Sequence, residues 1–328
     1  PHHYRARRQR QMCIRDSGTL GQIIPPSIAL VILGDVLATA YQQSQLKIGN
    51  YVAKSLSVGD LFMAAIVPGL ILVIIYGLYF IFNLRKEDII STNDSREESF
   101  IKLISTLAPP FFLIFAVLGS IIFGVASPTE AAGIGALGAI FIALLHKKLN
   151  LKILSETTKQ SAFISSMVFL ILIGASIFSL VFRGLGGEEL ITDIFNKIPG
   201  GLFGSMVLVM LLVFILGFIL DFIEITFIVV PIVGPILMAM GADPLWLGVM
   251  LAINLQTSFL TPPFGFALFY LRSVTPEQIK TETMYQGVLP FIVIQIFVLC
   301  LVAYFPFLAT YLPKIISVSY THLRAHET

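Results

Sequence analysis

Two pairs of adjacent prolines, Pro25–Pro26 and Pro262–Pro263, interrupt segments that are otherwise apolar enough to lie in a membrane. Proline has no backbone N–H and its ring clashes with the preceding helical turn, so a proline pair is expected to end a helix. In hydrocarbon, non-helical backbone is tolerated only where protein buries it or water reaches it. The two pairs therefore predict two places where backbone polar groups become available to a ligand at membrane depth.

The composition supports a membrane location. Hydrophobic residues make up 56% of the chain and charged residues only 12%, whereas soluble domains carry about 25% charged residues. The chain is therefore predicted to be an all-α, polytopic membrane protein that has the lipid bilayer as its environment. The net charge of +2 gives no indication of a nucleic-acid partner. The two cysteines, Cys13 and Cys300, show neither disulfide nor metal-site spacing, and we expect no cofactor.

Several apolar segments approach the length of about 20 residues that a spanning helix needs. The expected helices are Leu61–Leu84, Ala108–Val125, Thr129–Leu145, Ser161–Phe182, Leu202–Leu220, Ile225–Met240, Leu245–Phe259 and Val288–Tyr311. Phe264–Leu271 is too short to span, and Leu20–Leu37 is interrupted by its prolines. Short or interrupted apolar segments at matching places in two halves are a sequence indication of a transporter's binding site.

The two halves of the chain follow the same order of features. Each proline pair is followed by an apolar stretch, then by a polar segment (Tyr41–Asp60 and Arg272–Gln286), then by a full span. The order predicts an internal repeat whose first copy is truncated, although proline-rich turns are also common in polytopic proteins without repeats. The predicted organisation is a remnant of the first repeat at 17–84, a polar linker at 85–107 and a second repeat at 108–317.

The two ends of the chain are expected to be artefactual tails, 1–16 and 318–328. Met12–Asp16 and Val318–His322 can be encoded by one fifteen-nucleotide stretch read on opposite strands. That stretch resembles the mosaic-end adapter of transposase-based sequencing libraries. Both tails are therefore left out of the reasoning about the fold.

Small and hydroxyl-bearing residues gather around both proline pairs. Unwound carbonyls and hydroxyls suit a hard cation such as sodium, and helix N-termini suit an anionic group. The candidate sodium and substrate residues are Gly18, Thr19, Pro25, Pro26 and Ser27 at the first break, and Asn254, Thr257, Ser258, Thr261, Pro262, Pro263 and Gly265 at the second.

Asp221 and Glu224 are acidic residues within the apolar run "GFILDFIEITF". Ionisable residues in such runs are functional candidates, and Asp221 is therefore included in the candidate site. Their spacing also fits a helix N-cap with Glu at the third position. Both an interrupted helix near the site and a loop at the membrane surface fit this pattern. Ser127, Pro128 and Glu130 form a second capping signal, and we interpret it as structural.

Four motifs together resemble the large membrane subunit of TRAP (tripartite ATP-independent periplasmic) transporters. They are "GTLGQIIPPSIALVILG", "SPTEAAGIGALGAI", "LDFIEITFIVVPIVGPI" and "LTPPFGFALFYLR". Each motif is modest by itself, but the four follow one another in the right order across Gly18–Pro313. The family's large subunits start further upstream, so the resemblance implies that this chain lacks roughly its first third.

The resemblance implies a mechanism that the residues alone do not give. Family members couple the import of organic acids, C4-dicarboxylates among them, to a sodium gradient across the bacterial inner membrane. They have two inverted repeats with re-entrant helical hairpins, and a transport domain moves like an elevator against a scaffold. Their partners are a small membrane subunit and a periplasmic substrate-binding protein. The matching motifs place the proline-pair residues named above in the two hairpin regions.

Two alternatives stay open at this point. One is a stand-alone sodium symporter for dicarboxylates or citrate, which works without a binding protein. The other, in a different functional class, is an intramembrane enzyme that uses Asp221 or Glu224. The favoured prediction is the transporter subunit, which is not an enzyme, and the sequence does not indicate which organic acid it carries.

Overall fold

The computed structural model describes residues 20–51, 56–84, 100–261 and 281–324. Within these ranges the chain forms helices and no strands. The elements are η1 (Leu20–Gln22), α2 (Ile28–Lys47), α3 (Val58–Leu84), α4 (Phe100–Ile122), α5 (Pro128–Leu145), α6 (Leu151–Gly184), α7 (Gly187–Lys197), α8 (Gly201–Leu216), α9 (Phe222–Ala239), α10 (Pro244–Leu260), α12 (Thr281–Tyr304) and α13 (Phe307–Arg324).

Five of the described helices, α3, α5, α6, α9 and α12, contain a segment long and apolar enough to cross a membrane. A sixth span results if α7 and α8, which meet at 119°, are counted together. Helices α8 and α10 are apolar but shorter than 18 residues. The prediction of an all-α polytopic membrane protein is confirmed at this level.

Three of the expected segments differ in extent from the elements of the structure. The predicted span Val288–Tyr311 is divided between α12 and α13, because Pro306 cannot donate the backbone hydrogen bond that would continue α12. Helix α2 continues to Lys47, through part of the expected polar segment Tyr41–Asp60. Helix α13 extends to Arg324 and so includes the beginning of the expected tail 318–328.

The chain divides into two compact units, which are described separately. One unit combines Pro1–Glu87 with Ile173–Thr328, and the other is Asp88–Leu172. Helix α4 begins at Phe100, inside the expected linker 85–107, and the predicted order of a first-repeat remnant, a linker and a second repeat stays a prediction.

The Asp88–Leu172 unit contains a hairpin of α4 and α5. Ser127 caps α5: its hydroxyl accepts from the Glu130 N–H, and the Glu130 carboxylate accepts from the Ser127 N–H at 2.8 Å. The predicted capping box is thus confirmed. The helices pack closely, since a Cβ at Gly138 of α5 would lie 2.3 Å from Leu113 Cδ1 of α4.

The expectation that a proline pair ends a helix is wrong for α4. This helix runs from Phe100 to Ile122 with Pro109 and Pro110 inside it, so it is longer than the predicted Ala108–Val125. The pair removes two intrahelical donors, yet the helical residues on both sides continue the same helix. The outcome at each proline pair therefore depends on the neighbouring sequence and packing.

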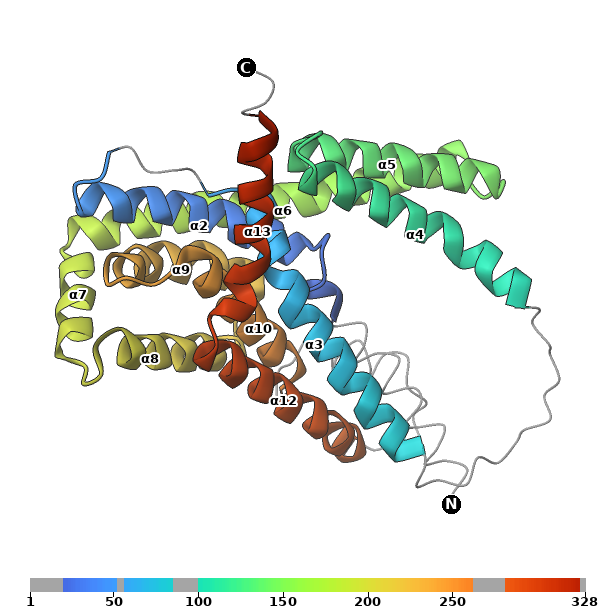
Figure 1. The fold of residues 1–328 in the computed structure, drawn as a ribbon. Coiled ribbons are helices and arrows are strands. Elements are labelled where there is room, and N and C mark those ends of the chain that lie inside the picture. Colours follow the sequence, from blue (N-terminus) through green and yellow to red (C-terminus); the bar gives the residue numbers. More distant parts are fainter. Residues whose placement is uncertain (1–19, 52–55, 85–99, 262–280, 325–328) are drawn as a thin grey trace. The chain divides into compact units, whose positions relative to one another are not determined.

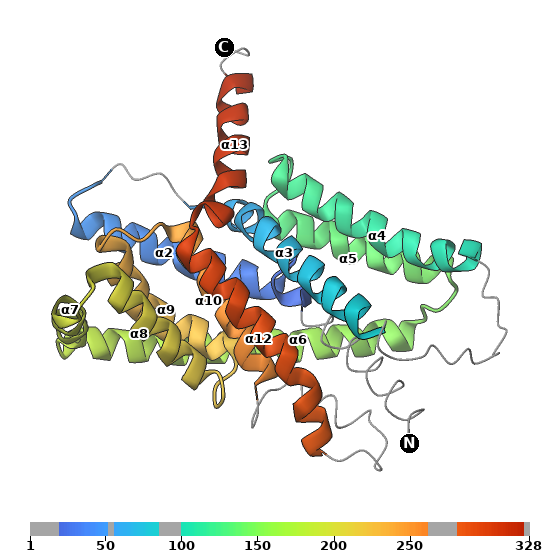
Figure 2. The same ribbon diagram turned by 60° about the horizontal axis from the view of Figure 1, so that its bottom comes forward.

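Helix α10 is the central element of the larger unit. Its residues from Trp246 to Ser258 are all buried, and it contacts α2, α3, α8, α12 and α13. Helices α2 and α9 run side by side, and α12 lies along α3 (Figure 1, Figure 2). A short helix that is buried on all sides must make its contacts through every face, so its polar side chains are all held inside protein.

The first turn of α10 is fixed by its N-cap and by its tryptophan. The Asp243 carboxylate accepts from the N–H groups of Leu245 (2.9 Å) and Trp246 (3.1 Å). The Trp246 indole N–H donates to the carbonyl oxygen of Val302 on α12 at 2.9 Å. An α-helix would pair that carbonyl with the N–H of residue 306, but residue 306 is proline. The indole therefore supplies the donor that the sequence of α12 lacks.

Candidate ion and substrate site

The first proline pair lies directly before α2. Pro25 is buried, Pro26 is exposed, and the helix begins at Ile28 with Ser27 as its N-cap. The Ser27 side chain is 3% exposed, accepts from the Leu30 N–H at 3.3 Å and donates to the Gln22 carbonyl of η1. The 3₁₀ turn η1 contacts α10 as well as α2 and α3. The segment around the first pair is thus held against the central helix.

The second proline pair follows the end of α10. The helix ends at Leu260, and Thr261 is its C-cap in an extended conformation. The predicted site residues Pro262, Pro263 and Gly265 lie outside the described residues, as do Gly18 and Thr19 at the other break.

The last two turns of α10 concentrate buried polar side chains. Asn254, Gln256, Thr257 and Ser258 are each at most 1% exposed. The Asn254 amide donates to the Met210 carbonyl of α8 at 2.7 Å. A row of this kind inside an apolar helix is expensive to bury unless each group has a partner. It is the densest buried polar row in the described part of the chain.

The three hydroxyls at this end bond within α10. The Oγ1 atoms of Thr257 and Thr261 donate to the carbonyls four residues earlier, and Ser258 Oγ donates to Leu255, each at 2.8 Å. Each hydroxyl has thereby committed its proton, and its oxygen keeps lone pairs directed away from the donated hydrogen. Oxygens in this state are suitable ligands for a cation.

The turn between α8 and α9 packs directly on these hydroxyls. A Cβ at Gly217 would lie 2.2 Å from Ser258 Oγ and 2.4 Å from Ser258 Cβ, so only glycine permits the observed approach. Next to this contact, the rings of Phe222 and Phe259 are 5.8 Å apart. Gly217 was not among the predicted site residues, although a glycine four residues before an acidic cap in an apolar run indicates a tight turn.

Asp221 and Glu224 form the N-terminal cap of α9. The Asp221 carboxylate accepts from the Phe222 N–H at 2.7 Å, and the Glu224 carboxylate accepts from the Asp221 N–H at 3.4 Å. This cap begins α9 close to the end of α10, and both interpretations of the acidic pair, an interrupted helix and a surface loop, stay predictions.

The arrangement brings two helix ends of opposite polarity together. The carboxyl end of α10 carries the negative end of its helix dipole, and the amino end of α9 carries the positive end of its own. The Phe222–Phe259 contact joins these two ends. A cation is favoured at the carboxyl end of α10, whereas the amino end of α9 already holds the carboxylates of Asp221 and Glu224.

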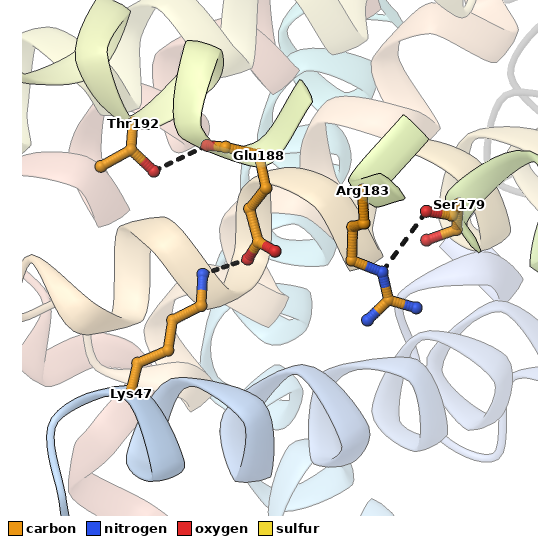
Figure 3. Close-up of polar contacts among 5 residues, drawn as sticks. All are labelled: Lys47, Ser179, Arg183, Glu188 and Thr192. Atoms are coloured by element: carbon orange, nitrogen blue, oxygen red, sulfur yellow. Dashed lines mark hydrogen bonds and ion pairs between the residues drawn. The ribbon is translucent and has the colours of Figure 1, made fainter. Parts of the chain in front are cut away.

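An ion pair holds α2 against α7 at the surface. Lys47, in the last turn of α2, is bonded to Glu188, in the first turn of α7 (Figure 3). Each charge lies at the helix end where the dipole favours it. Their side chains are 40% and 27% exposed, so the pair is a surface contact of small energy. Within the same region Arg183 Nε donates to the Ser179 carbonyl at 3.3 Å.

Comparison with known proteins identifies the family. The family described as tripartite ATP-independent periplasmic transporter, DctM component, matches residues 9–308. The chain belongs to this family. The resemblance drawn from the four motifs is confirmed.

Curated relatives agree with this assignment. The sialic acid TRAP transporter large permease protein SiaM of Vibrio cholerae is 30% identical over 302 residues, which is 90% of this chain and 65% of that protein. The C4-dicarboxylate TRAP transporter large permease protein DctM of Rhodobacter capsulatus is 29% identical over 306 residues, covering 93% and 68%. The ectoine/5-hydroxyectoine TRAP transporter large permease protein UehC of Ruegeria pomeroyi is 26% identical over 301 residues, covering 91% and 66%.

These relatives are all transporter permeases, but they differ in substrate. The chain spans about two thirds of their length. Their names are those of transporter permeases, and the substrates in the names differ from one relative to the next. The family of this chain is therefore established, whereas sequence identity of 26–30% to these relatives does not identify its substrate.

Proposed function

We propose that this chain is part of the large membrane subunit of a sodium-coupled transporter that imports organic acids. The subunit would act in the bacterial inner membrane, with a small membrane subunit and with a periplasmic protein that delivers the substrate. The observation that carries the proposal is the packing of the α8–α9 turn on the polar end of α10, seen as the contact between Gly217 and Ser258.

The two helix ends have separate roles in this proposal. Sodium binds at the carboxyl end of α10, with the oxygens of Thr257, Ser258 and Thr261 as candidate ligands. The carboxylate of the substrate binds beside the sodium ion, and Asp221 and Glu224, which occupy the amino end of α9, lie next to this position. Cation and anion then neutralise one another where the dielectric constant is low, so that each increases the affinity for the other. Such mutual dependence is the basis of coupled transport.

The first break has a supporting role. Both η1 and α2 contact the same central helix, so we include Pro25, Pro26 and Ser27 in the proposed site, and we include Gly18 and Thr19, which lie outside the described residues, through the family resemblance alone. The inverted repeats, re-entrant hairpins and elevator movement implied by the resemblance are part of the same proposal.

An intramembrane enzyme has less support. Asp221 and Glu224 are both engaged in the cap of α9, where their oxygens accept backbone N–H groups. A catalytic pair of carboxyl groups would instead be expected to address a shared position in a cleft.

The test is uptake by the full-length subunit, reconstituted with its two partners in liposomes. Uptake of labelled carboxylates is compared with an inward sodium gradient, with equal sodium on both sides, and with potassium in place of sodium. We expect accumulation only with the gradient. Equal uptake under all three conditions would refute sodium coupling, and uptake without the binding protein would favour a stand-alone symporter.

A further inference from the structure

Two fully buried glutamines lie on neighbouring helices and have no partners. Gln256 of α10 and Gln295 of α12 are each 0% exposed, and neither the carbonyl oxygen nor the amide nitrogen of either side chain has a hydrogen-bond partner. Each carboxamide has two donor hydrogens and an acceptor oxygen. Leaving such a group unpaired inside a protein is costly, and more so in hydrocarbon.

Helices α10 and α12 are antiparallel, and this places the two glutamines at one level. Near the start of α10, Trp246 bonds to Val302. At its end, Leu260 packs against Val288 and Ile292. Gln256 precedes Leu260 by one helical turn, and Gln295 follows Ile292 by one turn. Because the helices are antiparallel, these two steps lead in the same direction in space.

Both glutamines also lie on helix faces that border α3. On α12, Gln295 is one turn from Ile292, which faces α10, and one turn from Phe291, whose ring contacts Tyr76 of α3 at 4.9 Å. On α10, Leu260 faces α12 and Gly248 contacts Leu61 of α3. Gln256 lies on the helix surface between these two residues. Both glutamines therefore lie on the faces of α10 and α12 that border the junction with α3.

We propose that Gln256 and Gln295, which are unpaired as the structure places them, rotate about their side-chain torsions to form a hydrogen-bonded carboxamide pair that ties α10 to α12. One amide N–H of each glutamine donates to the carbonyl oxygen of the other, which satisfies a donor and an acceptor on both. A cation would engage only the oxygens and leave the four N–H hydrogens unpaired, whereas a second carboxamide suits donors and acceptors alike. The pair acts as a positioning contact, since Gln256 immediately precedes Thr257 and Ser258 in the sequence.

A double-mutant cycle tests the pair. Gln256→Met and Gln295→Met each remove one amide at nearly constant volume, and unfolding of the full-length protein is followed in detergent micelles. Each single substitution strands the other amide, so we expect the folded-to-unfolded ratio to fall about tenfold. The double variant leaves no stranded amide and should lose less than either single variant. Losses that multiply, to about a hundredfold in the double variant, would overturn the pair.

The matched control is Gln42→Met on α2, where the side chain is exposed. Combined with Gln256→Met, it should give simply multiplicative effects. If a single variant fails to fold, the double variant must recover folded protein; failure of the double variant as well would overturn the pair.

The transport readout rests on the proposed function. In sodium-driven uptake, each single variant should require several-fold more sodium for half-maximal rate, and the double variant should return toward the wild type. Unchanged sodium dependence in folded single variants would overturn the positioning role. If the wild type shows no sodium dependence while the stability cycle shows coupling, the proposed function fails and the pair stands.

Discussion

Gly217→Ala tests the contact on which the candidate site depends. Gly217 has φ −65° and ψ −6°, a right-handed helical conformation that alanine adopts without strain. The effect of the substitution therefore comes from the added Cβ alone. That atom would lie 2.2 Å from Ser258 Oγ and 2.4 Å from Ser258 Cβ, whereas carbon atoms in contact are normally about 3.5–4.0 Å apart.

The overlap cannot be relieved by a rotation of the serine hydroxyl, because the Ser258 Cβ is itself too close. Ser258 is 1% exposed, and α10 is packed on all sides, so the α8–α9 turn must move away. Overpacking of this kind costs about 1–3 kcal/mol. For a protein of this size the unfolding midpoint falls by about 2–4 °C for each kcal/mol.

The assay uses the single tryptophan of the chain. Trp246 is buried at the other end of α10, so its fluorescence reports unfolding of the central helix without a label. Variants are heated in detergent at one scan rate, and the midpoints of the change in emission wavelength are compared. Gly77→Ala on α3 is the matched control, since a Cβ there meets nothing within 4 Å, and a helical Gly→Ala change is neutral or stabilising.

The Ser258→Gly variant tests whether the loss of stability in Gly217→Ala comes from this contact. Ser258→Gly removes both atoms that the new Cβ would strike, so Gly217→Ala should cost less than half as much in that background as in the wild type. An equal loss in both backgrounds, or no loss in either, would refute the close approach of the α8–α9 turn to α10.

Three further predictions concern single contacts of the described helices. Asp243→Ala removes the N-cap of α10 and should cost about 1 kcal/mol, measured as a lower Trp246 fluorescence midpoint; Asp243→Asn should retain most of the stability, and equal losses for both would contradict capping. Lys47→Ala and Glu188→Ala should each cost less than about 1 kcal/mol and the double variant no more, with the difference from wild type vanishing at high salt; a loss above 2 kcal/mol would show that the pair is not a surface contact. Ser127→Ala should destabilise α5 by about 1 kcal/mol while Ser127→Asp is tolerated, which amide hydrogen exchange in the first turn of α5 can measure; unchanged exchange in Ser127→Ala would be the contrary result.

Local features of the fold were predictable from the sequence. The caps at Ser127 and Asp221 follow from a side chain that accepts a backbone N–H and a Glu three residues later, a pattern that is complete within four residues. The start of α2 shares only the first of these two features, since Ser27 accepts the Leu30 N–H but residue 30 is not Glu, and the sequence led us to interpret Ser27 as a site residue and not as a cap. These signals depend on adjacent residues and need no knowledge of what packs against them.

Long-range contacts were not predictable in this way. The same dipeptide precedes α2 at Pro25–Pro26 and lies within α4 at Pro109–Pro110, so the sequence of the pair does not decide whether a helix ends. Gly217 and Ser258 are forty-one positions apart, and only the packing of α8, α9 and α10 brings them together. Gln256 was overlooked beside its hydroxyl-bearing neighbours because burial, not residue type, makes it unusual.

The most direct test of the sodium site is the sodium concentration that gives half-maximal uptake in the reconstituted full-length transporter. Ser258→Ala and Thr261→Ala, each shown by its thermal unfolding midpoint to be folded, are compared with Thr192→Ala on α7, whose hydroxyl also bonds to its own helix. The two α10 variants should need several-fold more sodium, and the α7 variant should match the wild type. If all three variants respond to sodium as the wild type does, the cation does not bind at the carboxyl end of α10.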